Sequence, residues 1–202
     1  MIVDPGLGNL RSVQKGFEQV GVDARVSADP DLVRGADRVV LPGVGAFGDC
    51  METLRRTGLA DAVREVVDAG RPYLGICLGL QVLLDDSEEF GRHDGLGWIP
   101  GSVVKFQASP DAKVPHMGWN RIRRPADHPV LGPEGLGEHY YFVHSYYAEP
   151  ADSGAVAAWC DHGVEFAAAV TRGANVVAVQ FHPEKSQADG LRLLERFSRW
   201  AP

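Results

Sequence analysis

The sequence predicts an α/β fold in which a mostly parallel central sheet is flanked by helices and carries a mixed or antiparallel extension. In the first half of the chain, short β-branched apolar runs alternate with helical patterns, which is typical of βαβ units. After Trp98, short runs are separated by Gly, Pro and Asp, which indicates antiparallel or mixed strands. The chain has 202 residues, 45% of them hydrophobic, and no internal repeat or linker, so we expect one domain over residues 1–202.

The individual elements follow from local patterns. Leu10, Val13 and Phe17 recur at helical spacing, Asn9 can cap the start of this helix, and Gly21 can end it. We expect parallel strands at 1–4, 24–27, 38–41 and 72–76, and later strands at 102–106, 140–143 and 155–159.

A terminal helix is also expected. Leu191, Leu194 and Phe197 form one apolar stripe, and Ser186 can open the helix that carries them. Such a helix would cover one face of the sheet.

Composition excludes several classes of function. A net charge of -7 without a Lys/Arg run argues against a nucleic-acid binder, and no apolar run is long enough to cross a bilayer. The first residues do not read as a signal peptide, so a cytoplasmic protein is the expectation. Cys50, Cys77 and Cys160 are odd in number and scattered, which fits neither a disulfide framework nor a zinc site. We expect no metal and no cofactor.

The strongest local signal is an apolar strand that runs into Gly75-Ile76-Cys77-Leu78-Gly79 and then into a helical stretch through Leu84. The pattern resembles a nucleophile elbow with Cys in place of Ser. Flanking glycines would allow tight packing, and a helix N-terminus would favour the thiolate. A buried cysteine in an apolar strand is the alternative, because such cysteines are common.

A second apolar strand ends in His182-Pro183-Glu184 and decides between these interpretations. A Cys nucleophile needs a base, and the base needs an orienting acceptor. His182 can be the base and Glu184 the acceptor, since two residues on in an extended segment the side chain returns to the same face. Together with Cys77 at the end of a parallel strand, the pair predicts a catalytic triad.

A third candidate is the loop of small residues from Gly43 to Gly48. It matches Gly-x-Gly-x-x-Gly, but we reject a dinucleotide site because the loop follows the third strand and Pro42 interrupts the junction. We expect backbone N–H groups of the Val44–Gly45 peptide and of Leu78 to hold an oxyanion. A peptide flip after Val44 would then switch the site on or off.

These pieces together resemble the class I (triad) glutamine amidotransferases along the whole chain. The matching segments are 42–45, 75–79 and 182–184. Further segments at 8–13, 115–120, 144–146 and 182–186 look like the glutaminase subunits of imidazole glycerol phosphate synthases, of the histidine pathway. Pro5 stands where that family usually has an aromatic residue. The resemblance implies a flavodoxin-like α/β fold.

Residue roles are implied by position in the same way. Cys77 would be the nucleophile, His182 the acid/base and Glu184 its orienter. The remaining implied roles are glutamine binding for Gly43, Gln81, Ser145 and Tyr146, and contact with a synthase subunit for Asn9, Trp119, Asn120, Tyr141 and Lys185.

The implied activity is hydrolysis of L-glutamine to glutamate and ammonia through a γ-glutamyl thioester. The ammonia would pass to a (β/α)₈ barrel cyclase, the other half of a heterodimer, which makes imidazole glycerol phosphate and AICAR, a purine precursor. No acceptor site is visible in this chain, which supports a partner. Open alternatives are a glutaminase for surface-sugar or pyridoxal phosphate synthesis, a silent module of the same fold that regulates a partner, and a free-standing hydrolase of γ-glutamyl compounds.

Overall fold

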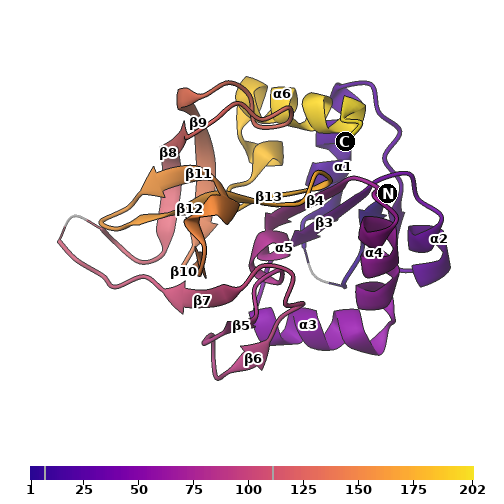
Figure 1. Cartoon of the computed structure of the whole chain (residues 1–202), viewed down its shortest axis with the longest axis horizontal. Coiled ribbons are helices and arrows are strands. Elements are labelled where there is room, and N and C mark those ends of the chain that lie inside the picture. Colours follow the sequence, from indigo (N-terminus) through magenta and orange to yellow (C-terminus); the bar gives the residue numbers. More distant parts are fainter. Residues whose placement is uncertain (7, 111) are drawn as a thin grey trace.

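The computed structural model describes residues 1–6, 8–110 and 112–202. Its main sheet has nine strands in the order β2-β1-β3-β4-β13-β12-β11-β8-β9, and the first five of these run parallel (Figure 1). Their bounds are Val26–Ser27 for β2, Ile2–Val3 for β1, Val39–Gly43 for β3, Tyr73–Cys77 for β4 and Val176–Val179 for β13. The predicted parallel sheet is confirmed.

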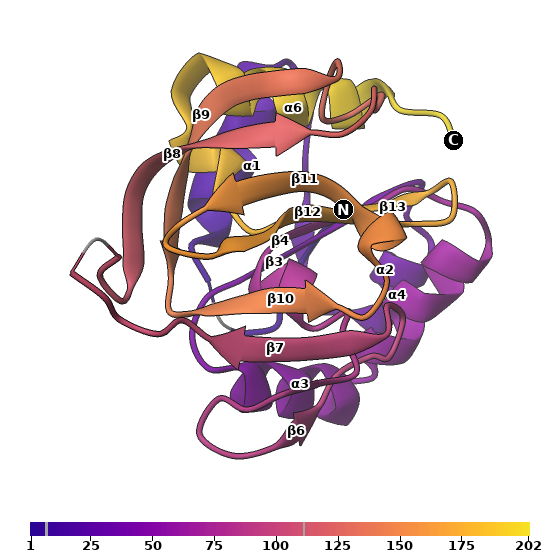
Figure 2. The same ribbon diagram turned by 60° about the vertical axis from the view of Figure 1, so that its left-hand side comes forward.

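The antiparallel extension is also confirmed. Its strands, each antiparallel to its neighbour, are β12 (Glu165–Arg172), β11 (Val156–Asp161), β8 (His116–Arg124) and β9 (Gly135–His144). A separate sheet has the order β10-β7-β5-β6, and Figure 2 shows β7 and β10 side by side, apart from β8 and β9. Its strands are β10 (Tyr146–Pro150), β7 (Gly101–Lys105), β5 (Asp86–Ser87) and β6 (His93–Asp94).

Helices cover both faces of the parallel strands. The helices α1 (Leu10–Gln19) and α6 (Gln187–Arg199) pack on one face, and α2 (Pro30–Arg34), α3 (Phe47–Arg56) and α4 (Leu59–Asp68) pack on the other (Figure 1). Because side chains alternate along a strand, Leu41 joins the core under α3 and α4, while Val40 joins the core under α1 and α6. No helix among the described residues is long and apolar enough to cross a membrane.

The first helix forms as predicted, because the Asn9 side chain accepts a hydrogen bond from the Ser12 amide. The last helix differs in two details. Its buried stripe is Gly190, Leu193, Leu194 and Phe197, whereas Leu191 is only partly buried. Ser186 precedes the helix, but its hydroxyl donates to the His182 carbonyl instead of capping.

Several predicted bounds were wrong. The strand expected at 38–41 continues through Pro42 to Gly43, since Pro42 pairs in register with Ile76 in a parallel ladder, so Pro42 does not interrupt it. The strand expected at 24–27 is reduced to Val26–Ser27. The helical stretch after the elbow, α5, covers only Leu78–Gln81 and does not reach Leu84, because turns follow it.

Candidate active site

Cys77 is the last residue of β4 and directly precedes α5. Its backbone has φ 54° and ψ −106°, a conformation that a residue with a Cβ rarely adopts. The side chain is 7% exposed and lines a cavity. The sharp turn therefore turns the sulfur toward a space that a ligand can fill, as in a nucleophile elbow.

The glycines on either side of Cys77 are required by close backbone approach. A Cβ on Gly79 would lie 1.8 Å from the carbonyl oxygen of Leu41, and a Cβ on Gly75 would lie 2.3 Å from the carbonyl oxygen of Gly79. Neither position has room for a methyl group. These contacts press the elbow against β3 and hold the turn in place.

His182 lies at the end of the neighbouring strand. The strands β13 and β4 are parallel, with Val179 paired to Ile76, so the segment after β13 emerges beside Cys77. His182 Nδ1 lies 2.8 Å from Glu184 Oε1, and the two side chains are 4% and 2% exposed. The prediction of an extended segment was wrong, because Pro183–Lys185 forms a 3₁₀ turn. The turn still brings the Glu184 carboxylate back to the imidazole.

The electrostatics of His182 suit an acid/base. Burial lowers the pKa of His182, but the sulfur of Cys77 and the carboxylate of Glu184 raise it, and their combined effect prevails. Since Glu184 accepts the proton on Nδ1, the other nitrogen, Nε2, is the one that can exchange protons. Nε2 is buried and has no hydrogen-bond partner among the described residues.

A cavity of about 300 Å³ joins these groups. It is lined by Val44, Gly45, Cys77, Leu78, Gln81, Glu89, Val143, His144, Ser145, Tyr146 and His182. All the residues predicted to hold an oxyanion are in this list, as are three of the four predicted to bind glutamine. Gly43 is the exception, because it lies against the Leu78 side chain and lines a separate, smaller cavity of about 10 Å³ to which His182 also contributes.

Glu89, Val143 and His144 line the cavity but were not predicted. Glu89 is the one carboxylate in the lining, and its Oε2 accepts a hydrogen bond from the Phe47 amide at 2.7 Å. It comes from the acidic run 85–89, in which no spacing marks one residue as a ligand. Its position depends on the fold of the loop between β5 and β6.

His144 belongs to a chain of hydrogen bonds. Its Nδ1 lies 2.8 Å from the Tyr146 carbonyl oxygen, which can only accept, so Nδ1 carries the proton. Its Nε2 lies 3.2 Å from His116 Nδ1, and His116 Nε2 lies 3.3 Å from the Asn120 amide nitrogen. Burial lowers the pKa of His144 to about 3 and that of His116 to about 4, which fits two neutral rings.

Four of the five predicted partner-contact residues lie close together. The Trp119 and Tyr141 rings are 6.2 Å apart, Lys185 Nζ lies 5.9 Å from the Tyr141 ring, and Asn9 lines the small cavity together with Lys185. Asn120 is different, because it lies on the opposite side of β8 from Trp119 and its amide is bonded to His116 and to the Asp161 carbonyl.

Other predicted features lie outside this site. Pro5 is buried. Cys50 and Cys160 are buried free thiols, and burial raises the pKa of each to about 12. No group of three or more His, Cys, Asp or Glu side chains suited to a metal ion occurs in the part of the chain that the structure describes.

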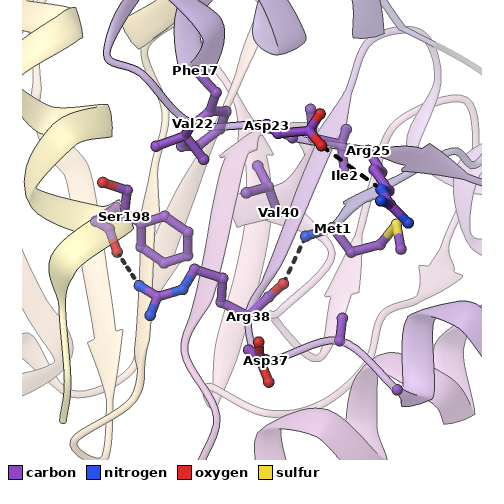
Figure 3. Close-up of a pocket in the computed structure, with 14 residues that line it drawn as sticks. Met1, Ile2, Phe17, Val22, Asp23, Arg25, Asp37, Arg38, Val40 and Ser198 are labelled. Atoms are coloured by element: carbon purple, nitrogen blue, oxygen red, sulfur yellow. Dashed lines mark hydrogen bonds and ion pairs between the residues drawn. The ribbon is translucent and has the colours of Figure 1, made fainter.

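A second cavity, of about 280 Å³, opens at the amino ends of the parallel strands (Figure 3). There the Met1 amino group donates to the Arg38 carbonyl at 2.9 Å, and the Arg38 guanidinium donates to the Phe197 carbonyl at 2.8 Å. These groups are already paired with one another. Ligands of open α/β sheets bind at the carboxyl ends of strands, which is where Cys77 lies.

Comparison with known proteins decides the family. Residues 1–199 match the family model "Glutamine amidotransferase class-I". The chain is 56% identical to the imidazole glycerol phosphate synthase subunit HisH of Syntrophotalea carbinolica, over 98% of both chains. It is 52% identical to the HisH subunit of Geobacter sulfurreducens, over 97% of this chain and 96% of that one.

The chain belongs to the class I glutamine amidotransferases, in the HisH family.

Solved structures show the same fold for this class I amidotransferase chain. A structure titled "Crystal structure of glutamine amidotransferase" superposes with a TM-score of 0.74 at 21% identity, over 98% of this chain and 97% of that one. The structure of PurLQS from Thermotoga maritima superposes with a TM-score of 0.75 at 17% identity, over 98% and 96%. The predicted fold class is confirmed.

Proposed function

We propose that this chain is the glutaminase subunit of an imidazole glycerol phosphate synthase and acts in the cytoplasm as one domain over residues 1–202. It hydrolyses L-glutamine and delivers the ammonia to a (β/α)₈ barrel cyclase in a heterodimer of the histidine pathway. The observation that carries the proposal is the strained Cys77 in one cavity with His182, whose Nδ1 is hydrogen-bonded to Glu184. The names of the two relatives reported above favour this synthase over other glutamine-dependent ones.

The first chemical step is attack by the Cys77 thiolate on the side-chain carboxamide of glutamine. The negative oxygen of the tetrahedral intermediate accepts hydrogen bonds from the Leu78 amide and from the Val44–Gly45 peptide. His182, held by Glu184, donates a proton to the departing nitrogen, so ammonia leaves and a γ-glutamyl thioester remains on Cys77. His182 then takes a proton from water, whose oxygen attacks the thioester and releases glutamate.

The cavity supports an amino acid as the substrate. Glu89 offers a carboxylate to the α-ammonium group of glutamine, and the Gln81, Ser145 and Tyr146 side of the cavity offers polar groups. The backbone at Gly45 has φ 99°, a conformation that favours glycine. Glycine at this position therefore allows the Val44–Gly45 peptide to adopt more than one orientation. We propose that this peptide reorients when the partner binds, which supplies or removes one oxyanion donor.

Partner dependence is part of the proposal because ammonia is a nucleophile only while it is unprotonated, which favours a closed route to the acceptor. The surface formed by Asn9, Trp119, Tyr141 and Lys185 lies next to His182 and Glu184. A partner on this surface would sit close to the point where ammonia is released.

The test is glutamate release from L-glutamine by the purified chain, alone and then with the barrel cyclase and its ribulosyl substrate. We expect low activity alone and a steep rise when both are added. Strong activity alone would identify a free-standing hydrolase. Silence in both conditions would identify a different partner or a regulatory module.

A further inference from the structure

A buried glutamine outside the triad contacts the sulfur of Cys77. Gln180 directly follows β13 and is 0% exposed. Because Val179 pairs with Ile76 in the parallel ladder, Gln180 stands next to Cys77 on the neighbouring strand. Its amide nitrogen, Nε2, lies 3.6 Å from Cys77 Sγ and donates to it.

The direction of this hydrogen bond follows from its neighbours. The carbonyl oxygen of Tyr146 can only accept, so the Gln81 atom that faces it at 2.9 Å is the amide nitrogen. The same nitrogen lies 3.1 Å from the Gln180 side chain, which must present its oxygen there. The nitrogen of Gln180 is then the atom left to face the sulfur. Gln81 therefore donates to both the Tyr146 carbonyl and the Gln180 oxygen, and Gln180 in turn donates to Cys77 Sγ.

An N–H donor forms a stronger hydrogen bond with a negatively charged thiolate than with a neutral thiol. The hydrogen bond from Gln180 therefore favours the thiolate form of Cys77. The amide dipole is fixed by burial and by Gln81, and it costs no rearrangement when the charge forms. Gln180 lies two residues before His182 in the segment that follows β13, and its hydrogen bond to the sulfur constrains the rotation of the Cys77 side chain.

We propose that Gln180 is a positioning residue of the glutaminase, which holds the Cys77 sulfur as a hydrogen-bond acceptor and keeps it aimed into the cavity. Gln81 orients Gln180, so one glutamine side chain that lines the substrate cavity also supports the nucleophile. This inference rests on the proposed role of Cys77 as the nucleophile.

The test is the rate at which iodoacetamide alkylates Cys77, measured against pH without glutamine and located by peptide mass spectrometry. The variant Gln180→Met keeps the length of the side chain but has no donor. We expect the midpoint of its alkylation profile to move up by about one pH unit. In Gln180→Glu a carboxylate faces the sulfur, and the midpoint should move up further. Gln107→Met, at an exposed position, is the matched control and should leave the profile unchanged.

Unfolding by urea shows whether each variant is folded, and Gln180→Glu carries the test if Gln180→Met does not fold. An unchanged alkylation profile in a folded Gln180 variant would overturn the inference. Such a result would leave the proposed function intact, because alkylation needs no glutamine turnover. The proposed function fails on a different result, namely glutamate release that survives Cys77→Ala.

Discussion

His182 Nδ1 and Glu184 Oε1 lie 2.8 Å apart although a 3₁₀ turn begins between them, and both side chains are almost fully withdrawn from water. An ion pair in such surroundings is stronger than one at the surface, because little water screens it. The stability of this ion pair depends on the charge of the Glu184 side chain as well as on the shape of that side chain.

Replacement of Glu184 by glutamine separates these two contributions. The amide has the shape of the carboxylate but no charge to stabilise a protonated imidazole, so we expect kcat for glutamate release to fall about 100- to 10,000-fold with a small change in KM. Steady-state kinetics with the cyclase present measure both. Activity within twofold of the parent would contradict a role for the carboxylate.

The strain at Cys77 predicts an inverted order of stability for two inactive variants. Glycine normally destabilises a strand end relative to alanine, but φ 54° with ψ −106° suits glycine. We therefore expect Cys77→Gly to be about 1 kcal/mol more stable than Cys77→Ala in urea unfolding, and both to release no glutamate. Equal stabilities, or a more stable Cys77→Ala, would show that the turn stores no strain.

Gly79→Ala should be among the most damaging small substitutions in the chain. The added methyl group would lie 1.8 Å from the Leu41 carbonyl oxygen, which belongs to the backbone and cannot rotate away. We expect a loss of about 3 kcal/mol or more in the free energy of unfolding. Gly35→Ala is the control, because its methyl group would have no neighbour closer than 3.7 Å and should change stability by less than about 0.5 kcal/mol.

Glu89 should act on binding more than on chemistry. Loss of its charge in Glu89→Gln removes an ionic partner of the substrate ammonium, so we expect KM for glutamine to rise about 10- to 100-fold. Glu88→Gln is the matched control, since Glu88 is exposed and its carboxylate accepts a bond from the Lys105 amide outside the cavity. A KM that rises equally in both variants would contradict a contact between Glu89 and the substrate ammonium.

The buried pair of His144 and His116 predicts sensitivity to acid. Their pKa values in the folded chain, about 3 and about 4, lie below the ordinary value of 6.5. Between the folded pKa of each histidine and pH 6.5, the unfolded chain therefore binds more protons than the folded chain. The contribution of these two histidines to the free energy of unfolding is therefore largest above pH 6.5 and decreases as the pH drops toward 4. In His144→Gln we expect this slope to be shallower by up to about 1.4 kcal/mol per pH unit.

Urea unfolding between pH 7 and pH 5 measures this slope. The variant His139→Gln serves as the control, because His139 is exposed on β9. The same slope in the parent and in His144→Gln would contradict the prediction, because it would show that His144 does not gain a proton on unfolding.

The sequence predicted the parallel strands well, because buried strands there are continuous apolar runs such as Val39-Val40-Leu41, and it predicted the first and last helices from their apolar stripes. It was weaker at the ends of elements. Pro42 looked like an interruption, but its missing N–H does not prevent Pro42 from pairing with Ile76. The short helix α5 ends early although residues 82–84 are apolar, because their burial alone does not distinguish a helix from a turn.

Some residues of the site could be predicted from the sequence and others could not. Cys77, His182 and Glu184 sit in local patterns with a chemical meaning, so they could be proposed from the sequence and are brought together by the pairing of β4 with β13. Glu89 and Gln180 could not, since an acidic run and a glutamine in an apolar strand have no distinctive spacing. What selects them is the tertiary fold, which sets one beside Phe47 and the other beside the sulfur.

The carbonyl group of Tyr146 accepts from both Gln81 and His144, so one peptide of β10 holds two side chains of the cavity. His144 stays neutral in the same tautomer across the physiological range of pH, because its pKa is about 3. Its ring nitrogens would then give nitrogen-15 resonances that do not shift with pH but do shift when β10 moves. His144 is thus a spectroscopic reporter, already present in the chain, for rearrangement of the cavity when a substrate or partner binds.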